Sequence, residues 1–169
     1  VVIDAYSGGG LLTAMLATQC KRVYGIELEP EASKCADSLK EKNGLWNMTN
    51  ICGYVEEKLP AVLEKEKGEK LRLILDPPRA GIARSVLYVL LKSGIPKLTL
   101  ISCNPATLAR DLGILTGSLM ENEQGELIKN SAYTQEGFEG FYEIEKIQPY
   151  DMFPQTKHVE TLVCLVRKA

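Results

Sequence analysis

The chain has 169 residues, of which 45% are hydrophobic and 25% are charged, and its formal net charge at neutral pH is −2. This length and composition are typical of one globular domain that buries about two thirds of its unfolded surface. The slightly acidic balance excludes a segment that holds nucleic acid by bulk electrostatic attraction. No apolar run approaches the ~20 residues that a membrane-spanning helix needs.

Apolar runs and helix-favouring segments alternate along the first two thirds of the chain. The apolar runs predict strands at 1–6, 22–28, 47–53, 71–78 and 97–103. The segments between and after them predict helices at 11–19, 29–44, 55–70, 85–94 and 105–119. We expect the second helix to end at Gly44 and the third to break near Pro60. The alternation predicts an α/β fold, a mostly parallel sheet with helices on both faces.

The last third of the chain follows a different pattern. Residues 121–141 are polar and punctuated by glycines, which predicts a long loop or a small inserted hairpin. Segments 141–153 and 158–168 then predict two strands separated by only a few residues. We therefore expect the sheet to finish with an antiparallel C-terminal strand pair.

The first strand ends in a glycine loop, and the second ends in an acid. Ligands of open parallel sheets bind at the carboxyl ends of the strands. Glycines at 8–10 allow a tight turn and close approach of a ligand, and Glu27 suits the two hydroxyls of a ribose. Thr13 replaces the glycine or alanine of the dinucleotide fingerprint, so NAD fits less well. Asp4, before the loop, favours a cationic nucleoside cofactor. The alternative for the glycine loop is a plain tight turn without a ligand.

The fourth predicted strand ends in Asp76, Pro77 and Pro78. They resemble the Asp-Pro-Pro-aromatic motif of enzymes that methylate exocyclic nitrogens, but Arg79 replaces the aromatic residue. Asp76 is well placed to hydrogen-bond the edge of a base. The alternative is that the two prolines merely end the strand.

Cys103 ends the fifth predicted strand, directly before a helix-start signal. Asn104 is a favourable N-cap and Pro105 suits the first helical position, so the partial positive charge of the helix start favours a thiolate at Cys103. A thiolate is a strong nucleophile, and the alternative is that Cys103 is a small buried apolar residue at the strand end. The remaining cysteines are interpreted as structural: Cys20, Cys35, Cys52 and Cys164. Five scattered cysteines without a Cys-x-x-Cys pair favour a reducing cytoplasm, and they suggest neither disulfides nor a metal site.

The segment 151–160 contains the single histidine of the chain, His158, and an acid two residues later, Glu160. On an extended segment these two side chains point to the same face, so one orients the other or both face the cleft. The alternatives are an ordinary hydrogen-bonded histidine and a surface acid.

Five motifs taken together resemble the RNA uracil-5 methyltransferase family, which methylates C5 of uridine in tRNA or 23S rRNA. The motifs are DAYSGGG, GIELEP, LILDPPRAG, SCNPATLARDL and DMFPQTKHVE, and they cover nearly the whole chain in the expected order. The resemblance implies the class I (Rossmann-like) fold and S-adenosyl-L-methionine as cofactor.

The resemblance also implies roles for individual residues. The residues that would contact S-adenosylmethionine are Tyr6, Gly8, Gly10, Glu27 and Asp76. Cys103 would add to C6 of uracil, and Glu160 would remove the C5 proton. Candidates for contacting the substrate are Asp76, Asn104 and His158. No residue is proposed as a metal ligand.

Members of that family carry an upstream part of the catalytic domain and usually an RNA-binding β-barrel, and the chain opens on Val1 inside a predicted strand. We therefore expect residues 1–169 to be a catalytic fragment that alone methylates RNA weakly or not at all. The expected partner of the full-length protein is RNA, without DNA or membrane. Two alternatives are an N-methyltransferase using Asp76 and a non-catalytic RNA-binding module with a methyltransferase fold.

Overall fold

The computed structural model describes residues 1–133, 135, 140–152, 154–156 and 159–168. The chain folds as two compact units, Val1–Asp76 and Pro77–Ala169. Within the described residues, no helix is both long enough and apolar enough to cross a bilayer.

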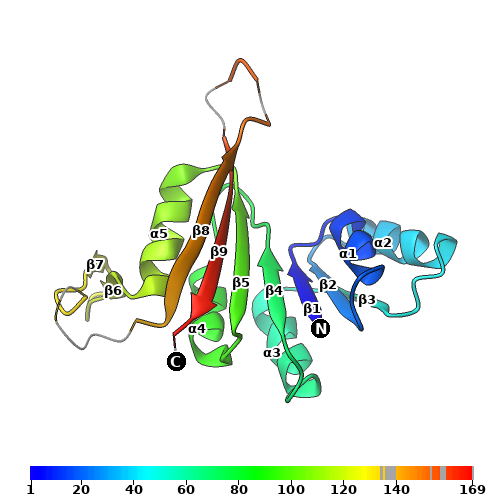
Figure 1. Ribbon diagram of the computed structural model, residues 1–169, viewed down its shortest axis with the longest axis horizontal. Coiled ribbons are helices and arrows are strands. Elements are labelled where there is room, and N and C mark those ends of the chain that lie inside the picture. The colour runs from blue at the N-terminus through cyan, green and yellow to red at the C-terminus, as the bar shows by residue number, and fades with distance from the viewer. Residues whose placement is uncertain (134, 136–139, 153, 157–158, 169) are drawn as a thin grey trace. The chain divides into compact units, whose positions relative to one another are not determined.

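The first unit is a parallel sheet of four strands with three helices (Figure 1). Its elements are β1 (Val2–Ala5), α1 (Leu11–Ala17), β2 (Val23–Glu27), α2 (Pro30–Lys42), β3 (Met48–Cys52), α3 (Val55–Lys65) and β4 (Arg72–Leu75). The strand order is β3-β2-β1-β4, and Val2 lies level with Val23 on one side and Arg72 on the other. The carboxyl ends of β1, β2 and β4 therefore lie side by side.

Helices cover both faces of this sheet, as the alternation of strands and helices predicts. On one face Val23 and Met48 pack with Ala14 of α1 and Ala36 of α2. On the other face, Tyr24 lies beneath the end of α3, with the Lys65 ammonium 5.1 Å from the centre of its ring. A sheet buried on both faces explains why its strands read as nearly continuous apolar runs.

Helix α3 runs unbroken through Pro60, so the expected break is wrong. Pro60 is exposed, whereas Val55, Leu59 and Val62 form a buried stripe along the helix. A proline inside a helix costs about 3 kcal/mol. Burying each of the three aliphatic side chains contributes roughly 1.5–3 kcal/mol, so their packing outweighs the proline.

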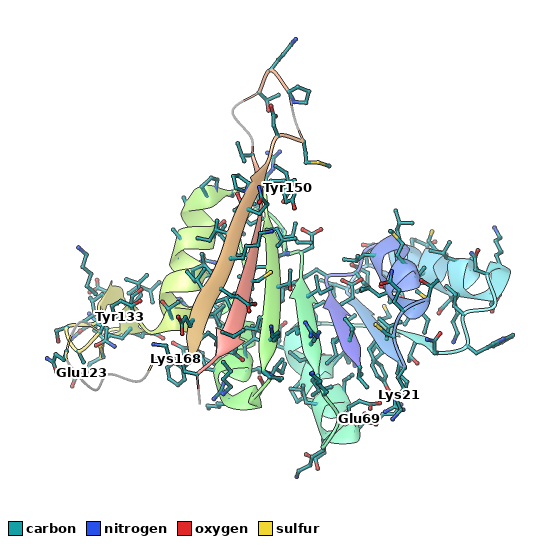
Figure 2. The ribbon with its side chains drawn as sticks, viewed as in Figure 1. Lys21, Glu69, Glu123, Tyr133, Tyr150 and Lys168 are labelled. Carbon is teal, nitrogen blue, oxygen red and sulfur yellow. The ribbon has the colours of Figure 1, made fainter. Side chains whose placement is uncertain are left out.

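Ion pairs close the amino end of the same sheet. Figure 2 shows Lys21 and Glu69 together there, with the ammonium 2.6 Å from the carboxylate. Arg22 bonds the buried carboxylate of Glu66, which lowers the pKa of Glu66. The acids at this end are therefore paired with bases, and we interpret them as structural.

The second unit is built around three antiparallel strands. Its elements are α4 (Arg84–Ser93), β5 (Lys97–Ser102), α5 (Pro105–Thr116), β6 (Leu119–Glu121), β7 (Leu127–Lys129), β8 (Tyr142–Tyr150) and β9 (Glu160–Arg167). Strand β9 pairs with both β5 and β8, which confirms the antiparallel C-terminal pair (Figure 1). The expected insertion contains a small hairpin, β6–β7, whose first strand begins at Leu119.

Buried apolar pairs fix the register of β5 against β9. Leu98 lies opposite Leu165, and Leu100 lies opposite Val163. All four side chains are at most 1% exposed. A slip of one residue would turn them all to the other face, so the register is strongly determined.

Candidate active site

The loop after β1 has the backbone shape that its glycines predict. Tyr6, Gly8 and Gly10 all lie in the left-handed region, with φ of 65°, 53° and 80°. A Cβ on Gly10 would lie 2.5 Å from the Cβ of Ala36 in α2, whereas nothing lies within 4 Å of the same position on Gly8. Close packing therefore requires glycine at position 10, while Gly8 leaves space for a ligand to reach the backbone.

The carboxylate of Glu27, at the end of β2, holds this loop. Its Oε2 accepts a hydrogen bond from the Gly8 N–H at 2.7 Å, and its Oε1 accepts one from the Glu29 N–H at 2.8 Å. Each carboxylate oxygen can accept more than one hydrogen bond. Glu27 is therefore fixed in orientation and retains the capacity to accept from the hydroxyls of a ribose.

Two exposed apolar side chains beside Glu27 were missed by the sequence analysis. Leu28 follows Glu27 directly, and Tyr54 follows Gly53, whose N–H donates to the Glu27 carbonyl at 2.8 Å. Leu28 is 49% exposed and Tyr54 is 52% exposed. A large apolar residue directly after a polar strand end is the signal that sequence reading could have used.

Three acids lie at the carboxyl end of the same sheet. Asp4 is 1% exposed, and the Thr13 hydroxyl donates to its Oδ2 at 2.6 Å. Burial raises the pKa of Asp4 to about 6, opposed by the Thr13 hydrogen bond and reinforced by the charges of Asp76 and Glu27. Burial also raises the pKa of Asp76, whose N–H donates to the Ala5 carbonyl. This concentration of acids suits a positively charged ligand group.

The first unit thus brings together the predicted cofactor residues Tyr6, Gly8, Gly10, Glu27 and Asp76. These features fit a cationic nucleoside: Glu27 can accept from a ribose, the backbone at Gly8 is open, and nearby acids suit a positive charge. The individual contacts of these residues with a cofactor stay predictions.

In the second unit, the helix start behind Cys103 is confirmed. Asn104 caps α5, because its Oδ1 accepts a hydrogen bond from the Ala106 N–H at 3.1 Å, and Pro105 is the first helical residue. Cys103 is half-buried between the end of β5 and this cap. The chain therefore holds the thiol between two fixed elements.

The register of β5 and β9 relates Cys103 to Glu160. The last pair of the ladder is Ser102 with Thr161. Cys103 follows Ser102 directly, and Glu160, the first residue of β9, directly precedes Thr161. The structure thus brings a thiol and a carboxyl group to the same end of one strand pair.

Residues of α5 that the sequence analysis did not single out hold the loop after Asp-Pro-Pro. The Arg110 guanidinium donates to the carbonyls of Ala80 and Ile82, each at 3.1 Å. The buried Asp111 carboxylate accepts from the Ile82 N–H at 2.8 Å. The Asn104 amide and the Thr107 hydroxyl donate to the Arg79 carbonyl. Arg110 and Asp111 are a charged pair within a largely apolar helix, and this pattern could have indicated from the sequence that they hold a neighbouring loop.

His158 lies outside the described residues, so its predicted shared face with Glu160 and its contact with the substrate stay predictions. Within the part of the chain that the structure describes, no cluster of His, Cys, Asp or Glu side chains is arranged to hold a metal ion.

The fold and the polar strand ends define a class I methyltransferase domain. The chain matches over 98% of its length the Pyrococcus abyssi tRNA (uracil-54, C5)-methyltransferase in complex with S-adenosyl-L-homocysteine, with a TM-score of 0.72 and 27% identity, and covers 34% of that chain. An rRNA methylase from Streptococcus thermophilus shares the fold, with a TM-score of 0.61 and 18% identity over 99% of this chain and 86% of that one.

The family model for tRNA (uracil-5-)-methyltransferases matches residues 2–168. The chain therefore belongs to this family, which confirms the resemblance found in its motifs. An uncharacterized RNA methyltransferase of Clostridium acetobutylicum is 38% identical over 99% of this chain and 31% of the relative. One from Enterococcus faecalis is 36% identical over 99% of this chain and 32% of the relative. The chain spans about a third of the length of the curated relatives that it matches.

Proposed function

We propose that the protein carrying this chain transfers a methyl group from S-adenosylmethionine to C5 of a uridine in RNA, in the cytoplasm. The observation that carries the proposal is the last pair of the β5–β9 ladder, Ser102 with Thr161, because Cys103 and Glu160 are the chain neighbours of these two residues at the same end of the strand pair. Uracil-5 methylation needs a nucleophile and a base at one pyrimidine, and this strand pair offers both. Family membership and the acidic, glycine-lined end of the first unit support the cofactor.

S-adenosylmethionine is the cofactor, and when bound it supplies an electrophilic methyl group on a positively charged sulfur. Glu27 would accept hydrogen bonds from the ribose hydroxyls, because the Gly8 and Glu29 N–H groups hold its carboxylate in place. Leu28 and Tyr54 offer apolar surface to the adenine. Asp4 and Asp76 contribute negative charge that favours the sulfonium.

Cys103 begins the reaction on the uracil. Its thiolate forms a bond to C6, and the electron pair of the C5–C6 double bond moves to C5 as an enolate. C5 would then accept the methyl group that bound S-adenosylmethionine supplies, which leaves S-adenosylhomocysteine. Glu160 removes the C5 proton, the C5–C6 double bond re-forms, and the thiolate of Cys103 leaves.

The candidate substrate contacts follow from the family resemblance of the motifs. The proposed contacts with the uracil are Asp76, Asn104 and His158. The target base must leave its stack to reach Cys103, at a cost of a few kcal/mol.

The proposal is tested in the full-length protein with tRNA and rRNA transcripts that contain 5-fluorouridine. In 5-fluorouridine a fluorine replaces the C5 hydrogen, so Glu160 has no C5 proton to remove and the adduct with Cys103 cannot break down. We therefore expect the wild type to form a covalent protein–RNA complex that survives denaturation. The Cys103→Ala variant should form none, whereas the control Cys164→Ala should form it normally. Tritium release from C5-labelled tRNA and rRNA then identifies the substrate.

Methylation retained by Cys103→Ala would overturn the proposal in favour of an N-methyltransferase that uses Asp76. Failure of the wild type to methylate any transcript would favour a non-catalytic RNA-binding module.

A further inference from the structure

We propose that Asp4 is a positioning residue whose charge makes the site prefer the cationic S-adenosylmethionine over its neutral product, S-adenosylhomocysteine. The inference rests on the cofactor site proposed above and goes beyond it, because it assigns discrimination between substrate and product to a buried carboxyl group.

The hydrogen bond between Asp4 and Thr13 joins the two ends of the glycine loop. Asp4 belongs to β1, which the loop follows, and Thr13 lies in the first turn of α1, which begins after Gly10. The bond from the Thr13 hydroxyl to Oδ2 of Asp4 is 2.6 Å long and buried. A change in the charge of Asp4 therefore changes the hydrogen bond that joins β1 to α1, the two elements that position the loop.

A polar layer surrounds Asp4 beneath the loop. Asp4 is level with Gly25 on β2, and Gly25 is level with Asn50 on β3. A Cβ on Gly25 would lie 2.9 Å from the Ser7 hydroxyl and 3.1 Å from the Thr13 hydroxyl. The absence of a side chain at Gly25 thus lets hydroxyls of the loop and of α1 approach the interior on the side of Asp4.

The charged groups around Asp4 are acids. Glu27 from β2 and Asp76 after β4 both act on its ionisation, and α1 contributes only the Thr13 hydroxyl. On α2, Asp37 accepts a hydrogen bond from the Asn50 amide at 2.8 Å. The amino end of the same sheet differs, because Lys21 and Arg22 neutralise its acids.

A pKa near 6 means that Asp4 changes charge close to neutral pH. A sulfonium at this end of the sheet stabilises the ionised form, whereas the thioether of S-adenosylhomocysteine does not. An opposite charge nearby typically lowers a carboxyl pKa by one unit or more, and one unit corresponds to a tenfold change in affinity. We therefore expect the preference for S-adenosylmethionine to rise on the order of tenfold as pH rises through about 6.

The test is isothermal titration calorimetry of the full-length protein with each ligand from about pH 5 to 8. The measured quantity is the dissociation constant of S-adenosylhomocysteine divided by that of S-adenosylmethionine. Wild type and variants are compared at each pH, because the ionisation of the free ligands affects all of them equally. Asp4→Asn keeps an acceptor for Thr13 but loses the charge, so its ratio should not rise through pH 6. Thr13→Val removes a hydrogen bond that lowers the pKa of Asp4, so its transition should move to higher pH. Thr18→Val is the control, since this exposed hydroxyl donates to the Met15 carbonyl at the end of α1.

A wild-type ratio that does not change with pH would overturn the inference, as would an unchanged pH profile in Asp4→Asn. An unmoved transition in Thr13→Val would also contradict it. These results leave binding intact, so they differ from failure of the wild type to bind either ligand at any pH. That failure would overturn both the cofactor site and the inference.

Discussion

Replacing Gly10 by alanine probes the loop and its packing together. Gly10 has φ 80°, and its Cβ would lie 2.5 Å from the Cβ and 3.1 Å from the Cα of Ala36, and 3.2 Å from the Cε of Met48. The left-handed backbone costs a residue with a Cβ roughly 1–2 kcal/mol. An additional methyl group in a packed core costs roughly 1–3 kcal/mol. We therefore expect Gly10→Ala to lower the free energy of unfolding by about 2–5 kcal/mol.

Two matched glycines separate these contributions. Gly68 has φ 89° and Gly8 has φ 53°, and nothing lies within 4 Å of a Cβ on either. Gly68→Ala should therefore show the backbone cost alone, about 1–2 kcal/mol. Gly8→Ala should cost the same in stability and additionally weaken binding of S-adenosylhomocysteine, because it fills the open space of the loop.

The assay is scanning calorimetry of the full-length protein, following the transition that S-adenosylhomocysteine shifts. For a domain of this size, 1 kcal/mol corresponds to about 2–4 °C, so Gly10→Ala should lower Tm by roughly 5–20 °C. A loss of stability no larger than that of Gly68→Ala would refute the packing of the loop on Ala36.

Three further results are expected. Because burial raises the pKa of Asp4 from its ordinary 3.8 to about 6, the folded state loses stability as pH rises from about 4 to 6. Calorimetry should therefore find Asp4→Asn more stable than wild type by up to about 3 kcal/mol at pH 7. Below about pH 4 the variant should show no such gain. Asn104→Ala should cost about 1 kcal/mol by removing the cap of α5, whereas Asn104→Asp should restore it, and equal denaturation midpoints for the two variants would contradict the cap. Residues 1–169 alone should methylate RNA weakly or not at all, and efficient methyl transfer in a filter-binding assay would contradict this expectation.

The elements and the residues at strand ends could be predicted from sequence because their signals are local. Apolar runs, caps and glycines act within a few residues, so the start of α5 at Asn104 and Pro105 could be read directly. The same holds for the glycine loop and for the acids Glu27 and Asp76 that follow strands. Pro60 is the counterexample, since its local signal for a break was outweighed by packing of the buried side of α3.

The residues that end the strands, and the chemistry that they carry, could be predicted from the amino-acid sequence, because hydrophobic periodicity and capping depend on neighbours along the chain. The contacts of those residues depend on the tertiary fold: the Gly8 N–H donates to Glu27, the Thr13 hydroxyl donates to Asp4, and the β5–β9 register brings Cys103 and Glu160 to one end of the strand pair. These contacts join segments far apart in sequence, and they are fixed by how buried side chains on different elements pack, which no local pattern encodes.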